Sequence, residues 1–381
     1  MEFLWESLLS ITWQQLVMYV VGGLLIWLAI EKGFEPALLL PMGFGAILVN
    51  LPTSGVINQV TAGVGETHGI IQWLFEVGIS ASEAMPILLF IGIGAMIDFG
   101  PLLANPKLFL CGAAAQAGIF LAILLAAALG FDMKDAASIG IIGAADGPTS
   151  ILVSQVLHSN YVGAIAVAAY SYMALVPIIQ PFAIKLVTTK KDRAMRMPYR
   201  AQGVSKRLRI LFPIIVSVIA GLVAPSSVAL VGFLMFGNLI RECGVLTTLS
   251  KTAQNELANL ITLLLGITIS FSMKADQFVK PETLLIMVLG LVAFVLDSVV
   301  GVLFVKVLNL FTPKNKINPM VGAAGISAFP MSSRVIEKLG QEAAPQNQLL
   351  MHAVAAIVSG QIASVVAGGV ILQYCATHMI G

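Results

Sequence analysis

Long apolar runs alternate with short polar stretches along the whole chain. A helix needs about 20 consecutive apolar residues to cross the hydrocarbon core of a bilayer, and many of these runs approach or exceed that length. We predict membrane-spanning helices over residues 14–30, 37–51, 83–104, 106–130, 161–187, 210–224, 226–243, 253–273, 282–311 and 347–375. The pattern therefore predicts an all-α polytopic membrane protein with about ten transmembrane helices.

Two further apolar segments, 135–157 and 318–338, differ from plain spans in composition. Both are rich in Gly, Ala, Ser and Pro, and Gly and Pro loosen or interrupt a helix. We predict that each forms a broken helix or a re-entrant hairpin. A shorter stretch, 69–80, is predicted to lie in the membrane interface as a helix.

Composition supports the membrane assignment. Of the 381 residues, 58% are hydrophobic and only 10% are charged, and the mean hydropathy is +0.94. A soluble domain carries roughly 25% charged residues, so this class is excluded. The three cysteines and four histidines are scattered without metal-ligand spacing, which argues against a zinc-type or His-rich metal site.

The distribution of charge predicts an orientation. Residues 190–209 are rich in Lys and Arg and contain a single acid, so we expect this loop to be cytoplasmic. If both broken segments return to their own side, both termini lie outside. Only Lys134, Lys274 and Lys280 then fall outside among the basic residues, which agrees with the positive-inside rule.

The two halves of the chain resemble each other weakly. Three pairs of stretches match in the same order: 88–107 with 263–282, 143–148 with 322–327, and 42–48 with 234–240. We predict two inverted repeats, 1–187 and 210–381, joined by the loop 188–209. Inverted repeats with interrupted helices are typical of ion transporters, which bind their ion near the membrane midplane. Chance similarity between Gly- and Ala-rich stretches is the alternative.

Each repeat is expected to have two parts. Early spans, 14–51 and 210–243, contain no candidate ligand in mid-span and would form a scaffold. Later parts, 83–187 and 253–381, contain the broken segments and would form the core. All candidate ion ligands fall in this predicted core.

The first broken segment, "IGIIGAADGPTSILVSQ", places Asp146 beside Gly147 and Pro148. The Pro removes a backbone donor and breaks the helix, which frees carbonyl oxygens of the kind that bind alkali cations. An Asp at the centre of a membrane helix costs roughly 2.5–3.5 kcal/mol, so it should face a site or a partner. Alternatively Asp146 only caps the helix that Pro148 opens, and the two roles are compatible.

The second broken segment, "INPMVGAAGISAFPMSSR", repeats this arrangement. It pairs Asn318 with a following Pro, loosens the chain at Gly322 and adds the hydroxyl of Ser327. If the two breaks converge, Asp146, Asn318 and Ser327 would form one site. The alternative for Ser327 is a small residue in helix packing.

Three other polar residues lie in or near predicted spans. Tyr172 and Tyr170 point about 200° apart on a helix, so only one easily faces the core as a proton donor. Arg334 follows the second break near the cytoplasmic end and could bind a carboxylate, or could only set topology. Asp297 is predicted to be buried and to pair with Lys306 or a backbone donor.

At "GAADGPTSI", "NPMVGAAGISAFPMSSR" and "LLMHA…GQIASVVAGGV" the chain resembles the membrane-embedded beta subunit of the biotin-dependent, sodium-translocating decarboxylases. That family serves oxaloacetate, methylmalonyl-CoA, glutaconyl-CoA or malonate. The resemblance covers nearly the whole chain. It implies an enzyme that accepts carboxybiotin, decarboxylates it, and exports Na⁺ as a proton is taken up.

The resemblance also implies roles for individual residues. The motif aspartate that binds sodium falls on Asp146, and the essential tyrosine falls on Tyr172. Further motif positions fall on Asn318, Gly322 and Ser327 as sodium-site residues and on Arg334 as the trailing arginine.

The chain departs from the family pattern at one place. Relatives carry Gly-x-Asn after "MHA", where this chain has Ala355-Ala356-Ile357. Ile357 cannot bind a cation, so one site is expected to be weakened, rearranged or served by Ser359 or Gln361.

The biotin has to be carried by another chain. No biotinylation motif is present, because "SMKA" at 272–275 does not supply one. The resemblance implies a separate biotin carrier, a carboxyltransferase alpha subunit and a small membrane gamma or delta subunit. It also implies a homo-oligomer, a trimer, in a prokaryotic plasma membrane. The alternative function is a cation-coupled secondary transporter of an organic anion, and a purely structural membrane scaffold would leave Asp146 unexplained.

Overall fold

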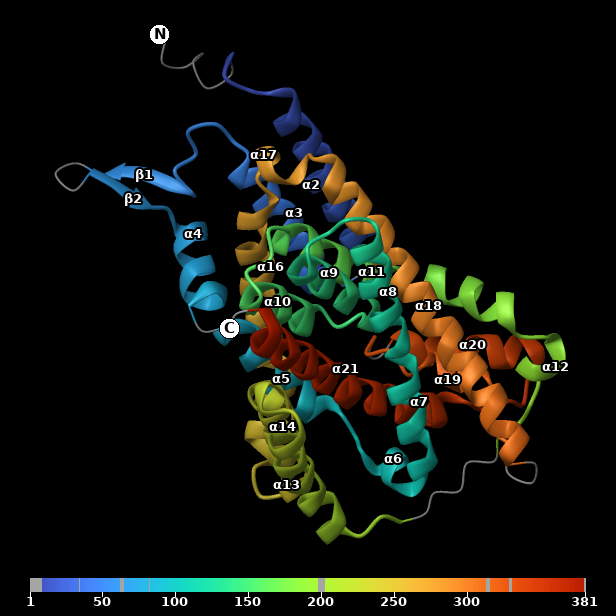
Figure 1. Cartoon of the computed structure of the whole chain (residues 1–381). Helices are drawn as coiled ribbons and strands as arrows, with labels where there is room; N and C mark the ends of the chain where they lie inside the picture. The colour runs from blue at the N-terminus through green and yellow to red at the C-terminus, as the bar shows by residue number, and fades with distance from the viewer. Residues whose placement is uncertain are drawn as a thin grey trace.

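The computed structural model describes residues 9–33, 35–61, 65–81, 83–197, 203–312, 316–328 and 331–379. Helices dominate the architecture, as Figure 1 shows. A helix satisfies all of its own backbone donors and acceptors, which an apolar surrounding requires. The predicted helical class is therefore confirmed for most of the described chain.

The first helices form a closely packed pair. Thr12 and Gln15 make a capping box at the start of α2 (Trp13–Glu31), and a Pro occupies the first turn of α3 (Pro36–Val49). Gly22 and Gly43 let the two backbones approach, since a Cβ added at Gly22 would lie 2.7 Å from the Gly43 carbonyl oxygen. Small residues at such crossings are characteristic of membrane helices.

A short hairpin corrects the expectation of an all-α chain. Strands β1 (Asn58–Thr61) and β2 (Gly65–His68) pair antiparallel, with Asn58 opposite His68, and project away from the helices (Figure 1). These strands are short and polar, so the search for apolar runs could not detect them. The helix expected over 69–80 is present as α4 (Ile70–Phe75), which continues into the π-helical turn η1 (Glu76–Ser80).

The rest of the first half is repeatedly interrupted. The span expected at 83–104 divides at Ile97–Phe99, and the span at 106–130 consists of two helices that meet at Gln116. In order, the elements are α5 (Ala84–Met96), α6 (Gly100–Ala104), η2 (Pro106–Leu108), α7 (Phe109–Ala115), α8 (Ala117–Ala128), α9 (Met133–Gly140), η3 (Ile141–Ala144), α10 (Gly147–Val156) and α11 (Val162–Val187). The α9–η3–α10 series covers the first predicted broken segment.

The second half contains the longest helices. Its elements are α12 (Lys190–Arg193), α13 (Lys206–Val223), η4 (Pro225–Ser227), α14 (Val228–Cys243), α15 (Thr247–Thr252), η5 (Ala253–Leu257), α16 (Ala258–Ile269), η6 (Ser270–Met273), α17 (Ala275–Phe278), α18 (Pro281–Phe311), α19 (Met320–Ala323), α20 (Met331–Ala343) and α21 (Leu350–Met379). The short α19 and the following α20 occupy the second predicted broken segment.

Within the described residues, six helices are long and apolar enough to cross a membrane, or up to eight if two bent helix pairs each count as one span. The sequence predicted about ten spans. Two of the expected spans fall short for visible reasons. The helix α3 has only 14 residues, and α13 begins with Lys206, Arg207 and Arg209.

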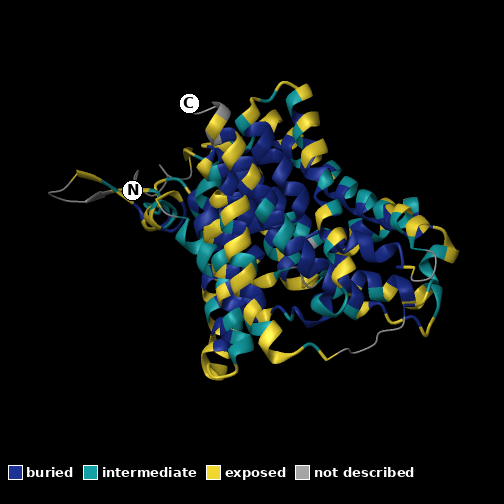
Figure 2. Cartoon of the chain, turned by 60° about the horizontal axis from the view of Figure 1, so that its bottom comes forward, coloured by how far each residue is buried: buried dark blue, intermediate teal, exposed yellow. Residues whose placement is uncertain are grey.

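Buried residues concentrate on the inner helices and on the inward faces of the outer ones, and exposed residues lie on the outer helices and the hairpin (Figure 2). The interrupted segments lie inside this buried region, since η3 and α19 are entirely buried and α10 nearly so. The outward faces of α2 and α13 are strongly apolar, with Leu24 and Leu222 more than half exposed. Such faces suit lipid or another protein rather than water.

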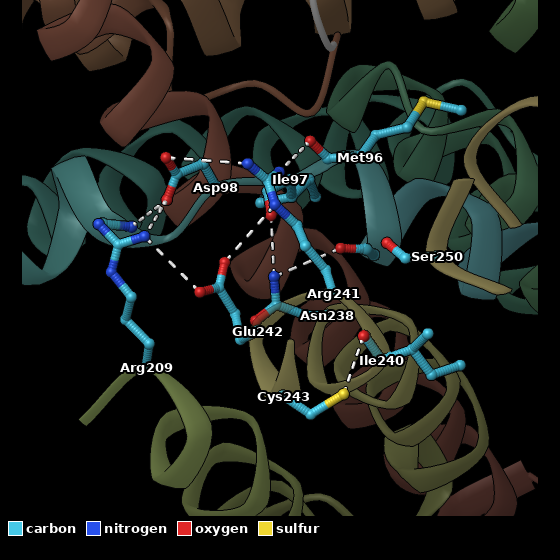
Figure 3. A network of polar contacts seen from close by, with 12 residues as sticks. Met96, Ile97, Asp98, Arg209, Asn238, Ile240, Arg241, Glu242, Cys243 and Ser250 are labelled. Carbon is cyan, nitrogen blue, oxygen red and sulfur yellow. Dashed lines mark hydrogen bonds and ion pairs between the residues drawn. The ribbon is translucent and has the colours of Figure 1, made fainter. Parts of the chain in front are cut away.

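A network of charged side chains joins the end of α5 to α13 and α14 (Figure 3). Arg209 lies 3.7 Å from Asp98 and 3.6 Å from Glu242, and Arg241 lies 3.9 Å and 3.5 Å from the same two acids. Asn238 donates to the Ile97 carbonyl at 2.8 Å. The last carbonyls of a helix lack partners within it, so these side chains complete the end of α5.

Candidate ion-binding site

The chain breaks at Asp146 in the way that its sequence predicts. The turn η3 ends at Ala144, and Ala145 adopts the left-handed conformation with φ 52° and ψ 39°. Asp146 is extended, with φ −118° and ψ 93°, and Gly147 and Pro148 then open α10. A left-handed alanine is unfavourable, so the surrounding packing has to hold this turn in place.

The carboxylate of Asp146 is buried and accepts hydrogen bonds from two helices. Within α10, Thr149 donates its hydroxyl to Oδ2 at 2.7 Å and its amide to Oδ1 at 3.4 Å. From α21, Ser364 donates its hydroxyl at 2.9 Å and Gln361 its side-chain amide at 3.1 Å, both to Oδ2. Asp146 is therefore the cap of α10 and also the centre of a polar cluster.

The second broken segment reaches the same cluster through Ser327. Its amide donates to the Ala144 carbonyl at 3.0 Å, which joins the two interrupted segments directly. Its hydroxyl lies 2.7 Å from the Ser364 hydroxyl and donates to the Gly360 carbonyl at 3.2 Å. Asp146, Ser364 and Ser327 thus form a continuous chain of side-chain hydrogen bonds.

This cluster offers oxygen ligands and one negative charge. Carboxylate, hydroxyl and carbonyl oxygens are the ligands that hard cations prefer, and helix breaks hold the cation in many ion-coupled membrane proteins. In the part of the chain that the structure describes, no three His, Cys, Asp or Glu side chains gather into a metal cluster. The arrangement suits a monovalent alkali cation.

The structure places Asn318 in other contacts. Its side-chain amide donates to the carbonyls of Met195 at 2.7 Å and Arg193 at 3.2 Å, and its Oδ1 accepts from the Met320 amide. It anchors the segment after α12 to the start of the second break. Gly322 lies against Gly301, where an added Cβ would be 2.8 Å from a Val305 methyl group, so it permits α19 to pack closely on α18.

The two tyrosines have different surroundings. Tyr172 donates its hydroxyl to the Met287 carbonyl on α18. The ring of Tyr170 packs against Gly147, directly beside the break. The buried Tyr170 hydroxyl has no hydrogen-bond partner among the described residues.

Arg334 lies on α20 and is exposed. The start of that helix is fixed by the buried Gln180 of α11, which donates to the Ser332 hydroxyl at 2.7 Å and to the Ala323 carbonyl at 2.9 Å. Among the described side chains, no carboxylate pairs with Arg334. Its guanidinium therefore lies exposed in the first turn of the helix that follows the second break.

The family departure at Ile357 has a structural counterpart. Ile357 is fully buried, and Ser359 donates to the Phe109 carbonyl at 2.7 Å, away from Asp146. Of the two substitutes that the sequence suggested, only Gln361 hydrogen-bonds to Asp146.

Thr149 and Ser364 were not identified from the sequence as neighbours of Asp146. A Gln and a Ser three residues apart share one face of an apolar helix, and this spacing could have revealed Ser364.

A helical chain with several helices long and apolar enough to cross a membrane, and with a buried carboxylate at a helix break, belongs to the class of polytopic membrane proteins. The chain belongs to a family within that class, the Na⁺-transporting oxaloacetate decarboxylase beta subunits, whose sequence model matches residues 14–375. Its members are membrane subunits of biotin-dependent, sodium-pumping decarboxylases. The resemblance stated from sequence is confirmed, and family membership favours the decarboxylase over the secondary transporter.

Individual relatives carry three different substrate names. The glutaconyl-CoA decarboxylase subunit beta of Acidaminococcus fermentans is 47% identical, with 96% of this chain and 95% of the relative covered. The methylmalonyl-CoA decarboxylase subunit beta of Propionigenium modestum is 46% identical, with 94% of each covered. The oxaloacetate decarboxylase beta chain 2 of Salmonella typhi is 43% identical, with 94% and 95% covered. Because these relatives are beta chains, the protein is one subunit of a larger complex.

Proposed function

We propose that this chain decarboxylates carboxybiotin delivered by a separate carrier and couples that reaction to Na⁺ export with proton uptake. The observation that carries the proposal is the junction of the two broken segments at Asp146. There a single buried carboxylate and two serine hydroxyls meet, and the Ser327 amide binds the Ala144 carbonyl of the first break. The reaction breaks the N–C bond of carboxybiotin, releases CO₂, and adds one proton to the biotin nitrogen.

In this proposal Asp146 supplies the negative charge of the sodium site. Thr149, Ser364 and Ser327 supply neutral oxygens, and Gln361 contributes its carbonyl oxygen when its amide turns. Na⁺ would displace the hydrogen bonds that now converge on Oδ2. Asn318 and Gly322 shape the second segment from outside this cluster, through the contacts described above.

Arg334 is proposed to receive the carboxyl group of carboxybiotin. Its guanidinium can hold a carboxylate through two parallel hydrogen bonds. It is exposed and close in sequence to the second break, which suits a group brought by a soluble carrier. This role places α20 and the loop 188–209 on the cytoplasmic side and both termini outside.

Tyr172 is proposed to orient or relay the proton that decarboxylation consumes. Its hydroxyl already bridges α11 to α18 through the Met287 carbonyl. A phenol can pass or position a proton inside a membrane domain. The proton and the Na⁺ would thereby use neighbouring but separate groups.

The assembly is proposed to contain a biotin carrier, a carboxyltransferase alpha subunit and a small membrane gamma or delta subunit. We also propose a homotrimer held by the early spans of each half, whose outward faces are apolar. The acid that is consumed would be bound by the carboxyltransferase. That division of labour explains why relatives named for three substrates match this chain at 43% to 47% identity.

The proposal can be tested with the purified complex in liposomes. Added carboxybiotin should be decarboxylated in a Na⁺-dependent manner, and radioactive Na⁺ should accumulate inside in proportion to CO₂ released. Na⁺ movement driven by an organic anion gradient without any CO₂ release would instead identify a secondary transporter.

A further inference from the structure

A second buried carboxylate lies near the middle of α18, apart from the proposed sodium site. Asp297 is 0% exposed. Neither of its carboxylate oxygens has a hydrogen-bond partner among the described residues. The pairing with Lys306 expected from sequence is wrong, because Lys306 lies 2.9 Å from Asp192 on α12. A lone buried carboxylate is costly in hydrocarbon and usually marks a functional site.

Backbone, rather than charged side chains, surrounds this carboxyl group. The amides of Gly118 and Ile119, in the first turn of α8, approach it without closing a regular hydrogen bond. A Cβ added at Gly118 would overlap Oδ1, and one added at Gly143 would lie 2.5 Å from Oδ2. Two glycines therefore make room for the carboxyl group and enclose it tightly.

This enclosure favours a proton over a metal ion as the ligand. A hard cation needs several oxygen ligands at about 2.3–2.6 Å, and each carboxyl oxygen here already abuts a glycine. The positive end of the α8 dipole also faces the group; it disfavours a metal cation there and stabilises the charged carboxylate enough for a bound proton to be released again. A proton needs no additional space and removes the charge.

Among the described residues, no Lys or Arg on the helices packed against α18 forms an ion pair with Asp297. The elements α8, η3 and α19 contain no titratable residue. The titratable residues of the other three packed helices are Cys111 in α7, Lys134 and Asp135 in α9, and Tyr170, Tyr172 and Lys185 in α11. Asp135 is held by Ser159 and Asn160, and Lys185 lies 3.9 Å from Glu342. A buried acid without a cationic partner becomes neutral by binding a proton.

Asp297 is connected to the sodium site by the chain itself. Gly143, which touches its Oδ2, lies three residues before Asp146 in the same interrupted segment. The short segment 143–146 therefore contacts Asp297 at one end and contains Asp146 at the other. Charges in a medium of low dielectric interact strongly, so a change of charge at one acid alters the energy of the other.

We propose that Asp297 is a proton-binding site of the membrane domain, which takes up one proton as Na⁺ leaves the Asp146 cluster. Uptake forms one O–H bond on the Asp297 carboxyl. Release breaks that bond and passes the proton on to the biotin nitrogen, which gains one proton in each decarboxylation. The inference rests on the proposed function for its coupling, but proton binding at Asp297 is measurable without turnover.

The test compares Asp297→Asn with Asp135→Asn, a second buried acid that is fully hydrogen-bonded. Infrared difference spectra of the complex in liposomes, recorded with and without Na⁺, should show a protonated-carboxyl C=O band. We expect the band to vanish in Asp297→Asn and to persist in Asp135→Asn. A band that persists in Asp297→Asn and vanishes in Asp146→Asn would overturn the proposal.

Two further measurements keep the test decisive. If Asp297→Asn fails to assemble, the wild-type complex is treated with a hydrophobic carbodiimide and the labelled peptides are identified by mass spectrometry. Labelling of Asp297 that changes with Na⁺ is expected, and absence of label at any pH would overturn the proposal.

If the variant assembles, Na⁺-dependent turnover should fall by about a hundredfold and lose its pH dependence, while Na⁺ still protects the complex against heating. A normal pH profile would make Asp297 a structural residue.

Discussion

The two interrupted segments contribute different chemistry to the same place. The first, η3 to α10, brings the buried carboxylate of Asp146 and caps its own helix with it. The second, α19 to α20, brings no acid to the cluster; it contributes Ser327 and leads within seven residues to the exposed Arg334. One segment therefore holds the charge that an ion needs. The other joins that charge to the surface where a carrier would dock.

The strongest test of this division removes the charge of the first segment. Asp146→Asn keeps the shape and several hydrogen bonds but loses the anion, so we expect Na⁺-dependent turnover to be abolished with assembly intact. Turnover is measured as CO₂ release against Na⁺ concentration, and size-exclusion chromatography checks assembly. Asp135→Asn, a buried acid outside the cluster, serves as the control. A variant that keeps its rate and Na⁺ dependence would reduce Asp146 to a helix cap.

A second test concerns the proton. Tyr172→Phe should lower turnover by about a hundredfold, because the hydroxyl that bridges to α18 is lost while the ring stays. Tyr170→Phe should have a mild effect, since its hydroxyl makes no hydrogen bond with a described residue. Both variants are compared by CO₂ release at saturating Na⁺. Equal and mild effects would count against a role for Tyr172, and a larger effect of Tyr170→Phe would shift the role to the residue beside Gly147.

Replacing Ser364, which links the two interrupted segments, should have a smaller effect on Na⁺-dependent turnover. Ser364→Ala removes a hydroxyl shared by Asp146 and Ser327, so the Na⁺ concentration for half-maximal rate should rise about tenfold, equivalent to about 1.4 kcal/mol. The matched control is Ser359→Ala on the same helix, whose hydroxyl bonds to Phe109 instead. Identical Na⁺ dependence of the two variants would place the ion elsewhere.

The smallest effect is expected at the far end of the second segment. Arg334→Lys keeps the charge but loses the planar fork that matches a carboxylate. The carboxybiotin concentration for half-maximal rate should rise several-fold, with the Na⁺ dependence unchanged. The variant is titrated with carboxybiotin at fixed Na⁺. No change in either value would leave Arg334 as a topology signal.

The helix breaks could be predicted from local sequence, whereas the contacts between distant segments could not. An Asp followed by Gly and Pro favours the start of a new helix, so the site of the first break followed from sequence. The partners of Asp146 on α21 depend on how segments more than two hundred residues apart pack together. For the same reason the sequence offered Lys306 or a backbone donor as the partner of Asp297, whereas Lys306 pairs with Asp192 from another part of the chain.

The junction of α5 with α14 has a mechanical consequence. Gly94 and Gly237 bring the two backbones together, and Arg241 and Asn238 bind the last carbonyls of α5. A helix fastened along its length and at its end moves only with its neighbour, so α5 should travel as a rigid piece with α14 and α13. Ile97 and Asp98, in the non-helical stretch that follows, are held to the same helices by Asn238, Arg209 and Arg241, so any tilting of the Asp146 segment against them would have to bend the chain beyond Asp98. That bend would be a hinge of the pump, placed apart from the residues of the proposed ion site.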